Sequence, residues 1–308
     1  MAAELVHTAL LAATPPFALS ASLRAMSGFA PCAGDQAVTA ADRVRKAFPV
    51  SDTEAAVVEV APRLDDTPGV ALSVFAERPL DGPEAAALEL WVRRWLGLDD
   101  DLAPFLAIAR RDPAMRPILA ATHGLHQVRF ASLAEATVYF TLTQRSTQWF
   151  AAARKRRIAA ELGPRLTVDG TEYVAFPDFP ALAEVDFDGY AGNPARGRRV
   201  AEVVAGVAAL DEEWLRTAPF PEARDALLHV RGIGTFTGHA LLLRALGRPD
   251  AVPLEMAQFT GVAQAVYGDD PPGPAELRDW YGPYVGWWSY VSRTGLGWLN
   301  REALSPAA

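Results

Sequence analysis

A Gly-x-Gly turn lies between two stretches of helical periodicity, at residues 232–234 of the 308-residue sequence. Glycine permits positive φ angles and leaves backbone N–H groups uncovered at the start of the next helix, where the helix dipole favours an anion. The turn could therefore hold one DNA phosphate through the backbone of Gly232, Ile233, Gly234, Thr235, Phe236 and Thr237. A tight turn that binds nothing can also require two glycines, so spacing alone leaves both interpretations open.

Acidic residues and prolines follow the turn one helix length later, at Asp250, Pro253 and Glu255. Turn, helix and acidic loop together resemble the helix–hairpin–helix DNA glycosylases, in particular the branch that includes 3-methyladenine DNA glycosylase II and 8-oxoguanine glycosylase. Further segments resemble motifs of this branch and extend the resemblance over most of the chain: 99–105, 123–130, 143–146 and 281–288.

The resemblance implies a catalytic aspartate at the position that Glu255 occupies. The glutamate is longer by one C–C bond, about 1.5 Å, and misplacing a catalytic group by about 1 Å can lower the rate on the order of a hundredfold. We expect Glu255 to stabilise the cationic sugar as the N-glycosidic bond breaks, with Asp250 as the reserve acid. The alternative role for Glu255 is a carboxylate at a helix start that complements the dipole.

Two further sites follow from the resemblance. The turn Gln144, Arg145 and Ser146 corresponds to the wedge that enters the duplex when a damaged base leaves the stack. Its alternative is an exposed arginine that contacts a phosphate. Residues 280–290 hold six aromatic side chains, of which Tyr284 and Trp288 share a helical face and could line the base pocket. Their alternative is a helix packed into the core, and Gln258 could add hydrogen bonds to a base.

We therefore expect a monofunctional DNA glycosylase that flips and excises damaged purines in base excision repair. Alkylated purines are favoured, because a cationic base leaves without a strong general acid. Bifunctional members place a nucleophilic lysine where this chain has Phe236, so no strand cleavage is expected. Two alternatives stay open: a damage-binding protein with weak or no catalysis, and a glycosylase for neutral 8-oxoguanine. The expected partner is double-stranded DNA with a damaged base, and a monomer is expected.

Composition limits the other classes of site. Cys32 is the one cysteine of the sequence, so neither an iron–sulfur cluster nor a thiolate zinc site is expected. The histidines lack metal-ligand spacing, and we expect no metal and no cofactor, apart from a monovalent cation that the hairpin could hold. A net charge of −8 opposes DNA binding, but residues 141–166 hold six basic side chains against one acid. The charge is thus segregated along the chain.

The elements that must position these residues follow from periodicity. Alternating apolar residues predict strands at 17–23, 55–61 and 70–76, whereas 37–48 is ambiguous. The segment 5–23 is uncharged but contains two prolines and follows no basic stretch, so we expect a cytoplasmic protein without a membrane segment.

Helical spacing dominates from residue 84 onward. It predicts helices at 84–96, 102–110, 133–142, 147–162, 197–210, 221–230, 235–246, 256–267 and 284–293. The predicted fold class is α+β and mostly α, in which a small N-terminal antiparallel-sheet domain over 1–80 precedes an all-helical helix–hairpin–helix glycosylase domain over 81–308. The helix–hairpin–helix itself is placed at 221–246.

Overall fold

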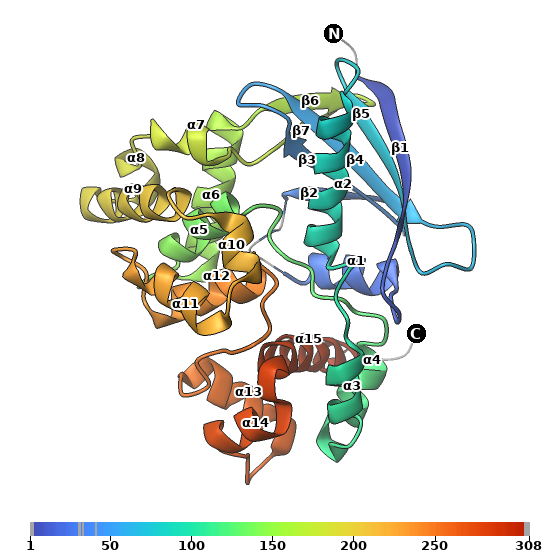
Figure 1. Ribbon diagram of the computed structural model, residues 1–308, viewed down its shortest axis with the longest axis vertical. Helices are drawn as coiled ribbons and strands as arrows, with labels where there is room; N and C mark the ends of the chain where they lie inside the picture. Colours follow the sequence, from blue (N-terminus) through green and yellow to red (C-terminus); the bar gives the residue numbers. More distant parts are fainter. Residues whose placement is uncertain (1–2, 30–31, 33, 41, 305–308) are drawn as a thin grey trace.

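The N-terminal part of the chain forms a sheet, and helices form most of the rest (Figure 1). The structure is a computed structural model that describes residues 3–29, 32, 34–40 and 42–304, with side chains through residue 301. The sheet is antiparallel, with strand order β1-β5-β4-β3-β2. Its strands are β1 (Glu4–Ala12), β2 (Gln36–Ala40), β3 (Arg43–Pro49), β4 (Ala55–Pro62) and β5 (Gly69–Ala76).

The predicted strands at 55–61 and 70–76 are confirmed as β4 and β5. In β5 every second side chain is buried, beginning with Val70 and Leu72, as expected for a sheet with one covered face. The ambiguous stretch 37–48 contains β2 and β3, which pair as a hairpin.

The predicted strand at 17–23 is wrong, because this stretch enters α1 (Leu19–Ser27). Leu19 and Leu23 fit a period of two together with Phe17 and Ala21, but Leu19, Leu23 and Met26 also recur at helical spacing, and these three are buried in the helix. The strand of this region is β1, which was not predicted. β1 is an edge strand and buries only Leu11 fully, so its sequence shows little alternation.

The helix α2 (Gly82–Leu96) lies across the sheet (Figure 1). Its start is fixed by a capping box in which the Asp81 side chain accepts from the Glu84 N–H and the Glu84 side chain accepts from the Asp81 N–H. It ends at Gly97, which has a left-handed φ of 62°. Trp95 of α2 packs edge-on against Phe48 of the sheet.

The remaining helices form the left and lower parts of Figure 1. They are α3 (Ala103–Ala109), α4 (Arg116–Ala121), α5 (Leu133–Leu142), α6 (Gln148–Leu162), α7 (Phe179–Ala183), α8 (Asp188–Ala191), α9 (Pro194–Ala208), α10 (Glu212–Thr217), α11 (Phe220–His229), α12 (Thr235–Arg244), α13 (Ala257–Tyr267), α14 (Pro274–Tyr281) and α15 (Val285–Leu304). The second part is not entirely helical, because β6 (Arg165–Val168) and β7 (Thr171–Val174) form a ribbon that lies against β3 and β4.

Hydrophobic packing continues across the boundary predicted near residue 80. One buried cluster joins the sheet and α2 to α13 and α15, and it runs from Leu11 to Trp298. A second cluster fills the space between α5, α6, α9, α11 and α12. The division into domains at 1–80 and 81–308 therefore stays a prediction.

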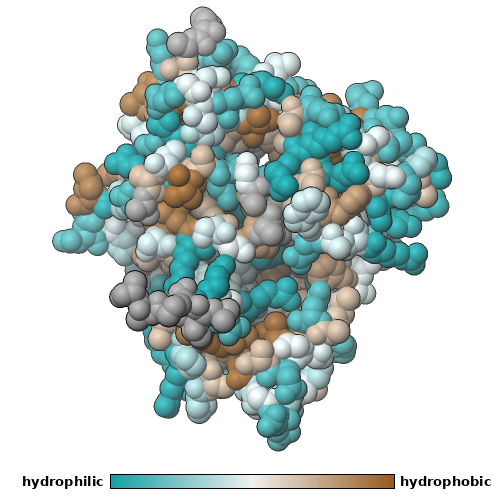
Figure 2. Space-filling model, turned by 180° about the vertical axis from the view of Figure 1, so that it is seen from behind, coloured by the Kyte–Doolittle hydropathy of each residue, from teal (hydrophilic) through white to brown (hydrophobic). Residues whose placement is uncertain are grey.

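In the part of the chain that is described, no helix is both long and apolar enough to cross a membrane. On the face opposite to that of Figure 1, brown apolar patches are separated by teal polar ones (Figure 2).

Candidate functional site

The predicted hairpin is confirmed as α11, a short turn and α12. The turn is closed by the Ile233 N–H, which donates to the Val230 carbonyl at 3.0 Å. Gly232 has a φ of +96°, and a Cβ at this position would lie 2.7 Å from the Val203 side chain. Gly234 is exposed and has a φ of −98°, and a Cβ there would meet nothing within 4 Å. The turn thus needs glycine at 232, whereas Gly234 leaves an open surface at the start of α12.

The predicted wedge turn contacts this hairpin directly. The Gln144 side chain donates to the Gly232 carbonyl at 2.9 Å and to the Thr237 hydroxyl at 3.3 Å. The next residue, Arg145, is exposed and has a left-handed φ of +52°, which costs a non-glycine residue about 1–2 kcal/mol. Strained backbone of this kind is concentrated at functional sites. The structure therefore joins two sites that lie far apart in the sequence.

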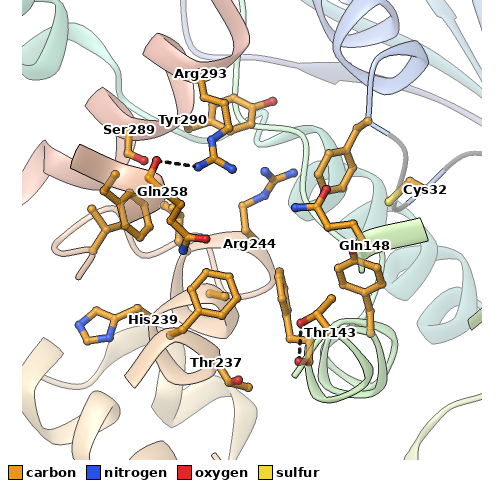
Figure 3. Close-up of a pocket in the computed structure, with 18 of the residues that line it drawn as sticks. Cys32, Thr143, Gln148, Thr237, His239, Arg244, Gln258, Ser289, Tyr290 and Arg293 are labelled. Atoms are coloured by element: carbon orange, nitrogen blue, oxygen red, sulfur yellow. Dashed lines mark hydrogen bonds between the residues drawn. The ribbon is translucent and has the colours of Figure 1, made fainter. Parts of the chain in front are cut away.

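Both sites line a cavity of about 1210 Å³. Figure 3 shows side chains that line this cavity from two helices. Thr237 and His239 belong to α12, and Tyr290 and Arg293 belong to α15. Of the predicted site residues, the cavity is lined by Gln144, Arg145, Ser146, Gly232, Ile233, Gly234, Phe236, Thr237 and Gln258. Aromatic rings form much of the wall: Phe29, Trp95, Tyr139, Phe140, Phe236, Phe259, Tyr290 and Trp298.

The predicted acids lie outside the cavity lining. Glu255 has a side chain that is 63% exposed and accepts a hydrogen bond from Arg278 at 2.6 Å. This bond holds the pKa of the Glu255 carboxyl below its usual value. Its neighbour Met256 does line the cavity. The reserve acid Asp250 pairs with Arg248 at 3.2 Å.

The two aromatic residues chosen for the base pocket also lie away from the cavity lining. Trp288 is fully buried, and its indole N–H donates to the Tyr267 hydroxyl at 3.3 Å. Tyr284 stacks on Trp287 with 5.6 Å between the ring centroids. The structure places both rings against the core, as in the alternative interpretation. The face of α15 that lines the cavity carries Ser289, Tyr290 and Arg293 instead.

The charge of the lining was not predicted. No aspartate or glutamate of the described chain lines the cavity. Five arginines do: Arg145, Arg199, Arg244, Arg293 and Arg301. The only sequence signal for Arg244 is that it interrupts an apolar helix after Leu241, Leu242 and Leu243. The cavity is therefore positively charged within a chain of net charge −8.

A buried ionic cluster lies beside the cavity. The Lys155 ammonium is 1% exposed and donates to Glu135 at 2.5 Å and to Asp35. Burial raises the pKa of Glu135, but the charges of Lys155 and Lys46, together with the hydrogen bonds that Glu135 accepts from Lys155 and from the Ala131 N–H, outweigh burial and lower the pKa to about 2. Cys32, Asp35 and Glu135 bring their ligand atoms within 4.8 Å of one another. Because the Lys155 ammonium already lies between both carboxylates and donates to each, we assign no metal ion to this cluster.

Similarity to known proteins is found in sequence and in fold. No protein-family model matches the chain. A DNA-3-methyladenine glycosylase of Bacillus subtilis (strain 168) is 27% identical over 184 residues, 58% of this chain and 60% of the relative. A probable bifunctional transcriptional activator/DNA repair enzyme AlkA of Mycobacterium tuberculosis is 31% identical over 164 residues, 52% of this chain and 33% of the relative. The chain thus spans less than two thirds of the length of either relative.

Solved structures match over nearly the whole chain. The 3-methyladenine DNA glycosylase from Archaeoglobus fulgidus gives a TM-score of 0.72 at 18% identity, over 98% of this chain and 100% of that chain. The structure of MBOgg1 in complex with a low-affinity DNA ligand gives a TM-score of 0.69 at 17% identity, over 99% and 100%. At these identities the likeness establishes a shared fold.

Proposed function

The relatives and structural neighbours of this chain are helix–hairpin–helix DNA glycosylases, and we propose that the chain is itself a DNA glycosylase that removes damaged bases in repair. The proposal rests on one observation. The Gln144 side chain is hydrogen-bonded to the hairpin, and the exposed Arg145 turn and the hairpin line the same cavity. A duplex whose phosphate lies on the hairpin would bring its base stack to the Arg145 turn. The cavity volume of about 1210 Å³ exceeds that of a single flipped base.

Glu255 is the proposed catalytic carboxylate. Heterolysis of the C1′–N bond leaves positive charge on the deoxyribose, which a nearby carboxylate stabilises while it helps to activate water. The Glu255 side chain must first leave Arg278, and its exposure leaves room for that movement. Met256 lines the cavity, so the backbone that carries Glu255 is already beside it.

The proposed enzyme is monofunctional. Strand cleavage through a Schiff base needs an accessible amine, commonly that of a lysine. The sequence has only two lysines, Lys46 and Lys155, which are 6% and 1% exposed. Phe236 holds the position of the nucleophile in bifunctional members, and it packs edge-on against Phe140. These placements support base release without cleavage of the strand.

We propose damaged purines as substrates, double-stranded DNA as the partner, a monomer and a cytoplasmic location. No cofactor is needed for this chemistry, and a monovalent cation bound by hairpin carbonyls stays a prediction.

A damage-binding protein without base release is the second candidate. It is favoured by the orientation of Glu255, whose carboxylate is held by Arg278 outside the cavity lining. Such a protein would bind damaged duplexes through the hairpin and the Arg145 turn alone.

The test is single-turnover base release from duplexes carrying 3-methyladenine, 7-methylguanine, hypoxanthine or 8-oxoguanine. We expect release by the wild type, a loss of about a hundredfold or more in Glu255→Gln, and strand breaks only after alkali treatment. Asp250→Asn serves as the matched control, because Asp250 is the other acid of the same loop. Lesion binding without any release would establish the second candidate, and a loss confined to Asp250→Asn would move the catalytic role to Asp250.

A further inference from the structure

Two hydrogen-bond donors in the cavity wall have no partner among the residues that the structure describes. The Tyr139 hydroxyl belongs to a side chain that is 1% exposed, and no described group bonds to it. The Nε of Arg244 is buried and equally unpaired. Both residues line the cavity. Because both atoms are buried in the wall, an acceptor in the cavity reaches them only when wall side chains shift, and it then relieves a cost of about 1–3 kcal/mol for each unpaired donor.

Arg244 is held by several contacts, and no carboxylate in the described part of the chain pairs with its charge. Its guanidinium lies over the rings of Phe29 and Tyr290, at 4.4 and 4.9 Å from their centroids, and it donates to the Val128 carbonyl at 3.1 Å. No ion pair joins it to a carboxylate of the described chain. Burial lowers the pKa of Arg244, and burial together with the charge of Arg244 lowers the pKa of Arg293. Two cations thus share one wall without an acid (Figure 3).

We infer that the cavity selects neutral damaged bases that present hydrogen-bond acceptors, and that Arg244 and Tyr139 determine this specificity. The inference rests on the proposed glycosylase function. A carbonyl oxygen or an unprotonated ring nitrogen would satisfy the unpaired donors, whereas an N-alkylated purine would bring a positive charge beside Arg244. Like charges repel strongly where water is excluded. The charge of the cavity therefore opposes the cationic substrates that the sequence favoured.

The chemistry of the leaving group points the same way. When the C1′–N bond of a neutral base breaks, the bonding electron pair moves onto the base, which becomes negatively charged until it is protonated. A fixed guanidinium and hydroxyl that donate to this base stabilise the developing charge in the transition state. A cationic base leaves as a neutral molecule and gains nothing from these donors.

The experiment compares base release from duplexes with hypoxanthine or 8-oxoguanine, which are neutral, and with 7-methylguanine, which is a cation. Each single-turnover rate is divided by the uncatalysed rate for the same duplex. We expect the wild type to accelerate the neutral lesions at least about tenfold more than the cation. Arg244→Met should lower release of the neutral lesions by a similar factor and leave 7-methylguanine unchanged or faster.

Two further variants make the experiment decisive. Tyr139→Phe removes the hydroxyl alone and should lower the neutral-to-cation ratio even if Arg244→Met fails to fold. Arg111→Met, an exposed arginine that does not line the cavity, should change neither rate. An equal or greater acceleration of 7-methylguanine by the wild type would overturn the inference, and so would an unchanged ratio in the folded variants.

Failure of the proposed function can be distinguished from failure of this inference. Absence of release from every duplex would refute base excision. The dissociation constants of the same duplexes for the Glu255→Gln protein then decide the specificity. Tighter binding of the hypoxanthine duplex that is lost in the Arg244→Met and Tyr139→Phe backgrounds supports the inference, and equal binding of all duplexes overturns it.

Discussion

Arg278 forms an ion pair with Glu255, the carboxylate on which the proposed chemistry depends. It lies in α14, whereas Glu255 precedes α13, and the two side chains meet at the surface at 2.6 Å. The motif located Glu255 in the sequence. The direction of its side chain could not be predicted, because it depends on an ion pair with a residue in a helix that the periodicity did not reveal.

At the residue scale, we predict that Arg278→Gln shifts the acid limb of base release to higher pH. The hydrogen bond from Arg278 lowers the pKa of Glu255, so its loss raises that pKa and protonates the carboxylate at a pH where the wild type is still ionised. Single-turnover rates from about pH 4 to 8 measure the shift. Near neutral pH the variant should be as fast as the wild type or faster, because the carboxylate is released. An acid limb that does not move would show that Glu255 is not the titrating base.

At the scale of elements, long periodic helices were predictable and short ones were not. The prediction for α5 matches at both ends, and those for α2, α6 and α12 differ from the structure by two residues or fewer at either end. Elements of about two turns or less, such as α7, α8 and α10, offer too few residues for a period to show. α15 continues well beyond the predicted end at residue 293, through Gly295. A Cβ at Gly295 would lie 2.8 Å from Ile118, so this glycine serves a close contact with α4 and not a break.

The two hairpin glycines provide a prediction at this scale. Gly234→Ala should leave the free energy of unfolding within about 0.5 kcal/mol of the wild type, because its φ is negative and the space around it is open. The same variant should weaken duplex binding at least about tenfold, because the added methyl occupies the surface where a phosphate would approach. Urea denaturation and a binding titration measure the two effects.

Gly232→Ala is the matched control with the opposite pattern. It should lower the free energy of unfolding by about 1–2 kcal/mol or more, because residue 232 has a positive φ and its Cβ would collide with Val203. If Gly234→Ala binds the duplex as tightly as the wild type, the hairpin is not the phosphate site.

At the scale of the whole molecule, Lys155 connects three segments. It belongs to α6 and bonds to Glu135 of α5 and to Asp35, which precedes β2. Periodicity places Lys155 on a helix but gives no sign that its ammonium is buried, because the neighbouring residues 154, 156 and 157 are all arginine. Four consecutive cations at 154–157 have the pattern of an exposed basic face.

We predict that Lys155→Met lowers the free energy of unfolding by about 3–5 kcal/mol, because it leaves buried carboxylates without a counter-ion. The pH dependence of stability should also change, because the variant should gain stability when mild acid protonates Glu135. Against the effect of burial, Lys155, Lys46 and the hydrogen bonds to Glu135 lower its pKa to about 2, so in the wild type the contribution of Glu135 is present above its usual pKa and is lost only as the pH falls towards 2. Without Lys155, burial raises that pKa, and protonation should relieve the variant at higher pH.

Urea denaturation as a function of pH measures both effects. Arg154→Met, in the same helix, is the matched control, because Arg154 contacts only the Phe150 ring among the interactions described for it. A loss for Lys155→Met no larger than that of this control would contradict the buried ionic cluster.

The cavity has walls from both ends of the chain. Met26 of α1 and Arg301 of α15 line it together with Tyr139 and the hairpin. A ribosome releases these walls in sequence, α1 and α5 before the hairpin and α15 after it. During synthesis the hairpin and the Arg145 turn therefore leave the ribosome before the part of the cavity wall that α15 provides. Under the proposed function, base recognition therefore depends on α15 as well as on the hairpin, and in the order of synthesis the surface that binds the duplex precedes the wall that holds Tyr290 and Arg293.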